Sequence, residues 1–243
     1  MDREEMFEEF LKECKDKEQI CGSGNHNSNI LLVGNEHYSE TLVDDWKDYL
    51  VRNYTYCAET KSWSNFNKSK TWLYYQKLID AALPNRLKPV VRGERNFEGD
   101  AFTTELNSEA KPSSSIKREG LKERVESRLE LFKKSDFIQS FPVVVLACGS
   151  YLTNRVEKGV TQINDTFDVK FDEELNKEGE PEGWHKSEKG KLWFTTHHSK
   201  DKKKLVIHTW QFSLKYTCHE DREWLINEMA SVIRDHLRKL GLI

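Results

Sequence analysis

A short apolar run closed by glycine constrains the fold of this chain more than any other feature. Residues 30–33 (ILLV) form such a run, and Gly34 ends it. Residues 141–148 (FPVVVLAC) form a second run, which Gly149 and Ser150 end in the same way. Apolar runs of this kind are typical of parallel strands buried on both faces. Because ligands of open α/β sheets bind just beyond the carboxyl ends of such strands, a functional site is expected after each glycine.

Helical and strand patterns alternate along the chain. Apolar residues at helical spacing predict helices at residues 4–17, 41–53, 71–83, 118–134 and 218–240. Two further strands are predicted at residues 100–107 and 205–209. This order predicts an α/β fold, a three-layer α/β/α sandwich around a short, mostly parallel four-stranded sheet. We expect one domain over residues 1–243, with an insertion at residues 153–204 that contains a small β element near residues 191–197.

Composition limits the classes of partner. The net charge is −3 and the pI about 6.3, so a surface that binds nucleic acid must be a local basic patch. No stretch approaches the apolar length that spans a bilayer, and the acidic N-terminal segment lacks the pattern of a signal peptide. We therefore expect a cytoplasmic protein without a membrane partner.

Cysteine and histidine spacing gives no sign of a metal. The five cysteines include no C-x-x-C pair, which argues against zinc and iron–sulfur sites and for free thiols. His197 and His198 are adjacent on a predicted strand, so their side chains point to opposite faces. We expect neither a metal nor an organic cofactor.

Four segments, in chain order, resemble the motifs of the uracil-DNA glycosylase superfamily. They are VGNEHYS after the first strand, FTTELN at residues 102–107, VVVLACGSYL at residues 143–152 and IHTWQFS at residues 207–213. The first is similar to the family's water-activating motif, the second to its uracil-reading strand, and the last to its His-Pro-Ser motif. The match runs from about residue 29 to the C-terminus, with residues 153–204 interrupting it. It implies hydrolysis of an N-glycosidic bond in DNA.

The resemblance implies two catalytic residues. Glu36 stands where the family places the group that orients and polarises the attacking water, and it would also stabilise the cationic sugar. His208 matches the histidine that stabilises negative charge on the departing base. Read without the resemblance, Glu36 is equally well a helix cap or a solvated side chain, and His208 a structural histidine.

The resemblance also implies a set of substrate-binding residues from the four motifs. They are Gly34, Asn35, Tyr38, Thr104, Asn107, Gly149, Ser150 and Ser213. Tyr38 matches the aromatic residue that excludes the methyl group of thymine, and Thr104 the position that reads uracil, with Asn107 close by as its alternative. Ser213 is implied as a phosphate contact. Gly149 and Ser150, expected at a helix N-terminus, form a second seat for phosphate, and the serines of residues 113–115 another. Trp46, Trp63 and Phe66 are the candidates for stacking on the base.

Three functions remain open from the sequence. The first is a DNA base-excision glycosylase. The second is a non-catalytic or redirected member of the same fold that binds a nucleobase, a nucleotide or another small ligand. It is motivated by the low pI and by His37, Thr104 and residues 209–210, which depart from the family motifs. The third is a protein-interaction domain that presents exposed aromatic residues to a partner. The candidates for that role are Trp63, Phe66, Trp184 and Trp193.

Overall fold

The structure is a computed structural model that describes residues 1–17, 19–36, 70–86, 96–107, 120–152, 154–155, 160–175, 179–188, 191–212 and 219–243. The helix expected at residues 41–53 lies outside the described residues. So do His37, Tyr38 and Ser213, the serines of residues 113–115, and the stacking candidates Trp46, Trp63 and Phe66.

Four parallel strands form the centre of the sheet. In spatial order they are β3 (Phe102–Asn107), β2 (Ile30–Glu36), β4 (Val143–Leu146) and β10 (Leu205–Thr209). Each neighbouring pair is parallel. The apolar side chains of β2 and β4 are 0 % exposed, as expected of strands covered on both faces. The four predicted strands are confirmed, with β2 longer than the apolar run by three residues.

Antiparallel strands extend both sides of this centre. β1 (Ser23–Gly24) pairs with β3, and β9 (Trp193–His198) pairs with β10. β7 (Lys170–Phe171) and β8 (Trp184–Lys186) both pair with β9. Within the described ranges the sheet therefore has eight strands, where the sequence predicted four. β7, β8 and β9 all come from residues 153–204, so this segment completes the main sheet, and β9 confirms the expected β element. β5 (Asn154–Arg155) and β6 (Val160–Thr161) form a separate two-stranded sheet.

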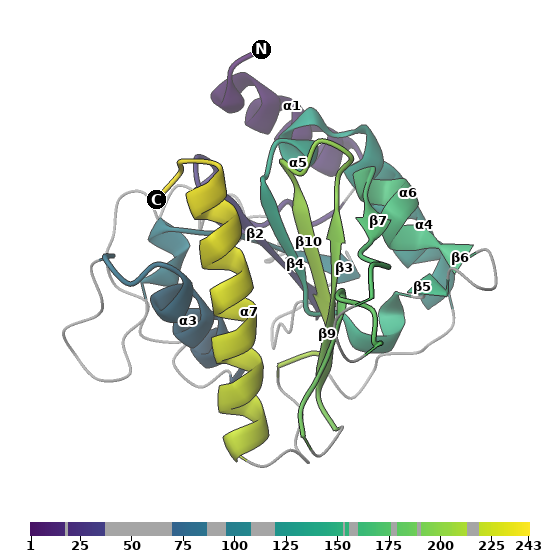
Figure 1. Cartoon of the computed structure of the whole chain (residues 1–243). Coiled ribbons are helices and arrows are strands. Elements are labelled where there is room, and N and C mark those ends of the chain that lie inside the picture. The colour runs from purple at the N-terminus through teal and green to yellow at the C-terminus, as the bar shows by residue number, and fades with distance from the viewer. Residues whose placement is uncertain are drawn as a thin grey trace.

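Helices cover both faces of the sheet (Figure 1). On one face lie α3 (Lys70–Ala82) and α7 (His219–Lys239). On the other lie α1 (Arg3–Asp16), α4 (Leu121–Lys134), α5 (Asp136–Gln139) and α6 (Gln162–Phe167). Alternate strand residues serve the two faces: Leu31 and Val33 pack towards α1 and α4, whereas Ile30 and Leu32 pack towards α3 and α7. The layered α/β arrangement predicted from the sequence is present, and the four predicted helices in the described residues are confirmed. None of the helices described is both long and apolar enough to cross a membrane.

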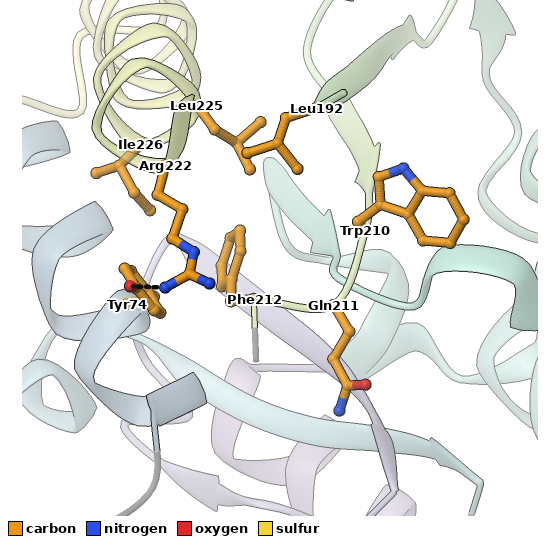
Figure 2. Close-up of a pocket in the computed structure, with 8 residues that line it drawn as sticks. All are labelled: Tyr74, Leu192, Trp210, Gln211, Phe212, Arg222, Leu225 and Ile226. Carbon is orange, nitrogen blue, oxygen red and sulfur yellow. Dashed lines mark hydrogen bonds between the residues drawn. The ribbon is translucent and has the colours of Figure 1, made fainter. Parts of the chain in front are cut away.

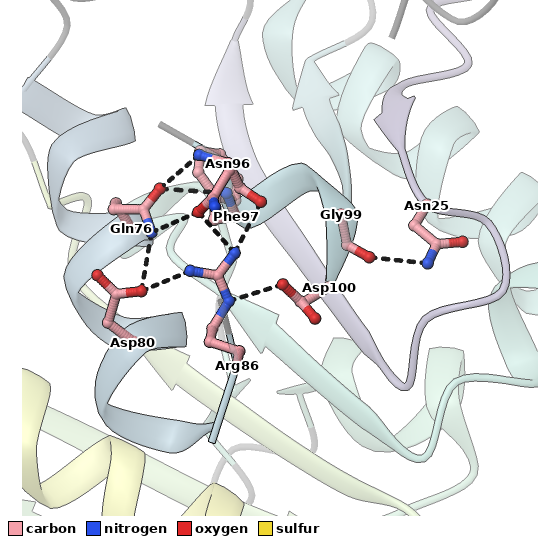
Figure 3. Close-up of polar contacts among 8 residues, drawn as sticks. All are labelled: Asn25, Gln76, Asp80, Arg86, Asn96, Phe97, Gly99 and Asp100. Carbon is pink, nitrogen blue, oxygen red and sulfur yellow. Dashed lines mark hydrogen bonds and ion pairs between the residues drawn. The ribbon is translucent and has the colours of Figure 1, made fainter. Parts of the chain in front are cut away.

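A buried arginine fixes the beginning of β3 against α3 (Figure 3). The Arg86 side chain, 4 % exposed, pairs with Asp80 at 2.5 Å and with Asp100 at 2.6 Å. Gln76 of α3 accepts hydrogen bonds from the backbone N–H groups of Asn96 and Phe97 at 2.9 and 3.1 Å. These contacts hold the short helix η2 (Phe97–Gly99) that leads into β3.

The loop before β2 is tied to the same short helix. The Asn25 side-chain amide donates a hydrogen bond to the Gly99 carbonyl at 2.8 Å (Figure 3). The starts of β2 and β3 are therefore held together, which fixes their parallel register and aligns their carboxyl ends.

The strand order identifies where a ligand crevice should lie. The chain leaves β2 for β3 on one side and later returns to β4 on the other side of β2. The strand order thus reverses between β2 and β4. In open α/β sheets the crevice lies at such a reversal, beyond the carboxyl ends of the strands.

Candidate functional site

The carboxyl edge of the four parallel strands gathers most of the predicted site residues. Gly34, Asn35 and Glu36 end β2, and the Cα of Glu36 is paired in register with that of Asn107 at the end of β3. On the other side of β2, Gly149 follows β4, and His208 lies in β10 opposite Leu146 of β4. Segments far apart in the chain thus meet at one edge, as the sequence predicted.

His208 is the best-defined polar side chain of this edge. It is 5 % exposed, and its Nε2 lies 3.1 Å from the Gly149 carbonyl oxygen. Because a carbonyl only accepts, Nε2 must hold the proton, which leaves Nδ1 as an acceptor. Burial lowers the pKa of His208 to about 4, against the smaller opposing effect of the Gly149 hydrogen bond. The imidazole is therefore neutral at pH 7.

An aromatic wall stands beside His208. Trp193 of β9 contacts the imidazole edge to face, with ring centroids 5.2 Å apart. Trp193 also stacks on Trp184 at 5.4 Å and meets Trp210 at 5.7 Å. Trp184 is 36 % exposed, so the wall reaches from the buried imidazole to the surface. The sequence offered Trp184 and Trp193 as candidates for a protein-interaction surface; in the structure Trp193 contacts His208, and Trp184 stacks on Trp193.

Gly149 packs against Trp210 of this wall, at a position that leaves no room for a side chain. Its φ is +52°, and a Cβ there would lie 2.9 Å from the Trp210 ring. The helix expected after Gly149 is the three-residue 3-10 helix η4 (Gly149–Tyr151). So short a helix has too few aligned peptides for a useful dipole, and the helix-based phosphate seat predicted at Gly149 and Ser150 is not formed. The Ser150 side chain is exposed.

Asn35 links the end of β2 to the segment after β10. Its side-chain Nδ2 donates to Gln211 Oε1 at 3.2 Å. The residue is 9 % exposed, and its Oδ1 is buried without a hydrogen-bond partner in the described structure. A buried amide oxygen of this kind is suited to accept an N–H from a ligand. Gln211 was not singled out from the sequence, because an isolated Gln after a strand has no distinguishing pattern.

Glu105 is a second residue that sequence reasoning missed. It pairs in register with Gly34, and a Cβ added at Gly34 would lie 2.2 Å from Glu105 Oε2. The carboxylate therefore covers the glycine. It also acts on the thiol of Cys148 and the hydroxyl of Tyr75, whose pKa values are raised by burial first and by Glu105 second. The signal in the sequence was a single acidic residue inside an otherwise uncharged strand.

Tyr75 and Cys148 are two buried ionisable residues on which Glu105 acts, and they belong to the hydrophobic clusters on opposite faces of the sheet. Tyr75 of α3 is 2 % exposed, and its hydroxyl has no hydrogen-bond partner among the described residues. The Cys148 thiol donates to the carbonyls of Val33 and Gly34, at 3.3 and 3.5 Å. A thiol committed to backbone carbonyls and kept protonated is not a nucleophile, so Cys148 is structural.

The two predicted residues of β3 differ in their surroundings. Thr104 is 3 % exposed, and its hydroxyl donates to the Cys21 carbonyl at 2.7 Å while accepting from Arg128 at 2.7 Å. It therefore lies on the α1 and α4 face and is not brought together with His208. Asn107 is 2 % exposed, and its Oδ1 accepts from Arg124 Nε at 3.1 Å. Asn107 lies opposite Glu36, at the edge where the other site residues gather.

A small pocket lies behind the segment that follows β10 (Figure 2). Its volume is about 10 Å³, which is room for one water molecule and not for a base. Arg222 of α7 closes one side, donating to the Tyr74 hydroxyl at 3.0 Å. The lining residues are Tyr74, Leu192, Trp210, Gln211, Phe212, Arg222, Leu225 and Ile226. A ligand the size of a base does not fit in this pocket.

The adjacent histidines of β9 have separate structural partners. His197 is 1 % exposed and contacts Thr195 Oγ1 and Asn164 Oδ1, both at 3.1 Å. His198 Nδ1 lies 2.8 Å from a carboxylate oxygen of Asp172. Within the described ranges, no group of three or more His, Cys, Asp or Glu side chains is arranged to hold a metal ion.

Comparison with known proteins does not assign the chain to a family. No family model matches it, and neither a curated protein nor a solved structure matches it significantly. The functional argument therefore rests on the geometry of the carboxyl edge.

Proposed function

We propose that the carboxyl edge of β2, β3, β4 and β10 binds a nucleobase and that the protein hydrolyses the N-glycosidic bond of that base in DNA. The proposed enzyme is a divergent relative of the uracil-DNA glycosylases. The observation that supports this most is the neutral, buried His208 beside Gly149 and Trp193. Asn35 and Asn107 end neighbouring strands at the same edge.

The proposed reaction separates charge between the sugar and the base. A base inside a duplex is inaccessible, so it must first be turned out of the stack. The bond between C1′ and the base nitrogen then breaks, and its electron pair stays with the base. Water adds to C1′ and gives up a proton to a carboxylate, the role proposed for Glu36.

A neutral imidazole is well suited to the other half of this reaction. If the base displaces the Gly149 carbonyl from Nε2–H, His208 donates a hydrogen bond to the oxygen on which negative charge collects. The imidazole gives up no proton in doing so, because its Nδ1 is already unprotonated. The Asn35 carbonyl oxygen would accept an N–H from the base edge, and Trp184 and Trp193 would offer a face for stacking.

The first test measures release of free uracil from labelled single- and double-stranded oligonucleotides. Wild type is expected to release uracil, and Glu36→Gln and His208→Ala are each expected to lower the rate constant by at least about 10²-fold. Glu126→Gln and His219→Ala, at exposed helix positions, are the matched controls and should retain the wild-type rate. Release that survives both site substitutions would refute the assignment.

A second candidate function is binding of a nucleobase or nucleotide without hydrolysis. Two observations favour it: His208 already donates its only N–H to Gly149, and the Thr104 hydroxyl is committed to Cys21 and Arg128. Calorimetric titration with uracil and with deoxyuridine monophosphate separates the two functions. Saturable binding that Asn35→Ala weakens, together with no base release from any oligonucleotide, would select this candidate.

A further inference from the structure

A second, larger cavity lies at the opposite end of the parallel strands. Its volume is about 640 Å³. Residues that immediately precede three of the central strands line it: Asn29 before β2, Pro142 before β4 and Lys204 before β10. It is therefore separated from the candidate site by the full length of these strands, and nothing inferred about it depends on the proposed function.

Arg3, the first residue of α1, is one of the residues that line this cavity, and its side chain is partly buried. Its guanidinium lies 4.3 Å from the ring centroid of Phe141, which also lines the cavity. Its Nε and Nη2 atoms are buried and have no hydrogen-bond partner among the described residues. These two atoms form the edge of a guanidinium that binds two oxygens of a carboxylate or phosphate in parallel. Burial lowers the pKa of Arg3 to about 10, so the group remains charged at pH 7.

Arg3 lies in the first turn of α1, where a positive charge is unfavourable. A positive charge in the first turn of a helix is opposed by the helix dipole. The acidic residues Glu4 and Glu5 follow it, as that dipole favours, and Asp2 and Glu5 form a capping box. Arg3 thus carries a charge that the dipole and the capping of this helix do not explain.

Lys204 supplies a second cation. Its Nζ donates to Gln139 Oε1 at 2.6 Å and forms no ion pair within the described structure. Burial lowers the pKa of Lys204 to about 8, while Asp168 and Asp201 act in the opposite direction. Both aspartates also line the cavity, and both have exposed side chains. Lys203, which is exposed, completes the set of charged lining residues.

Neither Arg3 nor Lys204 forms an ion pair among the described residues, and Asp168 and Asp201 compensate Lys204 only in part. A partly buried cation of this kind is costly unless an anion compensates it. The uncharged part of the wall is mixed: Leu240 and Leu242 contribute apolar side chains over the buried rings of Phe141 and Phe167, and Asn29, Gln139, Ser140 and Ser199 contribute polar groups. We propose that this cavity binds a small organic anion, a phosphate ester or carboxylate on an apolar body, with its anionic group towards Arg3 and Lys204. The two aspartates limit the charge of that group, because they would repel a polyanion.

The test is calorimetric titration of the full chain with phenyl phosphate, benzoate and inorganic phosphate. Wild type is expected to bind one of the two aromatic anions more tightly than inorganic phosphate, and the tighter of the two identifies the anionic group. Arg3→Gln and Lys204→Gln are each expected to weaken that binding by about tenfold or more. Lys202→Gln, at an exposed position outside the cavity, is the matched control and should bind as wild type does.

Two further variants keep the proposal falsifiable. Arg3→Lys preserves the charge and loses the two-pronged edge, so it should bind more weakly than wild type and better than Arg3→Gln. Leu242→Ser should weaken phenyl phosphate and leave inorganic phosphate unchanged, because Leu242 contributes only apolar wall. Thermal unfolding confirms that each variant is folded. No binding to wild type, or equal binding by wild type, Arg3→Gln and Lys204→Gln, would overturn the proposal.

Discussion

At the scale of single residues, Arg128 poses the sharpest electrostatic problem in the molecule. Its side chain is 0 % exposed, and it donates to the Ile20 and Glu105 carbonyls, the Thr104 hydroxyl and the Gln19 amide oxygen, all of which are neutral. The ionisable group that it contacts in the described structure is Cys14, at 3.6 Å between Nη1 and Sγ. Because a buried cation needs a counter-charge, we infer that Cys14 supplies it as a thiolate.

This pairing predicts a pH dependence of stability. Burial raises the pKa of the Cys14 thiol, but hydrogen bonding with Cys21 and the charge of Arg128 together lower it to about 7. A thiol whose folded pKa lies below its unfolded value adds stability as pH rises between the two. The free energy of unfolding, measured with urea, should therefore increase from pH 7 to 8.5 by on the order of 1 kcal/mol.

Cys14→Ser isolates this effect. Serine does not ionise in this range, so the variant should lack the Cys14 part of the increase. Cys21, whose pKa is raised by its hydrogen bond to Cys14 and by burial, opposes stability only above its unfolded pKa of about 8.5. A variant whose free energy of unfolding rises between pH 7 and 8.5 as steeply as that of wild type would argue against the thiolate.

A second residue-scale prediction concerns Gly34. Because a Cβ there would lie 2.2 Å from the Glu105 carboxylate, Gly34→Ala must displace Glu105 or the strand. We expect a loss of about 1–3 kcal/mol in the free energy of unfolding. Gly99→Ala is the matched control, since a Cβ at Gly99 would meet no atom within 4 Å. The same substitution is then made in a Glu105→Ser background. If Gly34→Ala lowers the free energy of unfolding there by no more than Gly99→Ala does in wild type, the clash with Glu105 is the cause of the loss. If the loss is the same with and without Glu105, the clash is excluded as the cause.

At the scale of elements, the network around Arg86 predicts how strongly α3 is coupled to β3. Arg86→Met would leave Asp80 and Asp100 without their shared cation, in a partly buried setting. We expect a loss of about 3 kcal/mol from the free energy of unfolding, with Arg86→Lys intermediate because it lacks the planar fork. Arg238→Met, at an exposed ion pair, should change stability by less than about 0.5 kcal/mol. Equal effects of the two methionine substitutions would refute the coupling.

The elements that the sequence predicted share a physical property that the missed ones lack. β2, β4 and β10 are apolar runs, and α3 and α7 repeat apolar residues over three or more turns, so burial alone specifies them. β1, β7 and β8 have two or three residues each and depend on the backbone edges of longer strands. Such pairing is a property of the assembled sheet, so no local sequence pattern predicts it.

The same distinction separates the contacts of the candidate site that the sequence predicted from those that it did not. The sequence predicted that Asn35, Asn107, Gly149 and His208 would meet, because strand ends in a parallel sheet share an edge. It did not predict that Glu105 would cover Gly34 or that Gln211 would bond Asn35. Those contacts depend on register and on side-chain direction, which only the packed sheet fixes.

At the scale of the whole molecule, two buried histidines on adjacent strands should set the resistance to acid. Burial lowers the pKa of His197 to about 3 and that of His208 to about 4. Both histidines gain protons in the unfolded chain near pH 6.5, so the folded state loses stability as pH falls below that value. This loss of stability is absent well above pH 6.5, and it grows as the pH falls until His208 is protonated in the folded state near pH 4 and His197 near pH 3.

The variant His208→Asn tests this through the slope of the free energy of unfolding against pH. Between pH 6 and 4.5 the free energy of unfolding of the variant should fall less steeply than that of wild type, by about one proton or ~1.4 kcal/mol per pH unit. His219→Asn, 78 % exposed at the start of α7, should keep the wild-type slope. Identical slopes for His208→Asn and wild type would show that His208 is not held neutral by folding.

The short strands at the margins of the sheet also bear on how copies of this chain behave towards one another. β1 at one margin has two residues, and β7 and β8, with two and three, cover the six-residue β9 at the other. A long bare strand is a template for pairing with a second chain, and strands this short offer little of one. Loss of residues 170–188 would bare β9 along its length and favour aggregation through edge-to-edge pairing. The margins thus limit self-association, and β8 also supplies Trp184 to the aromatic wall of the candidate site.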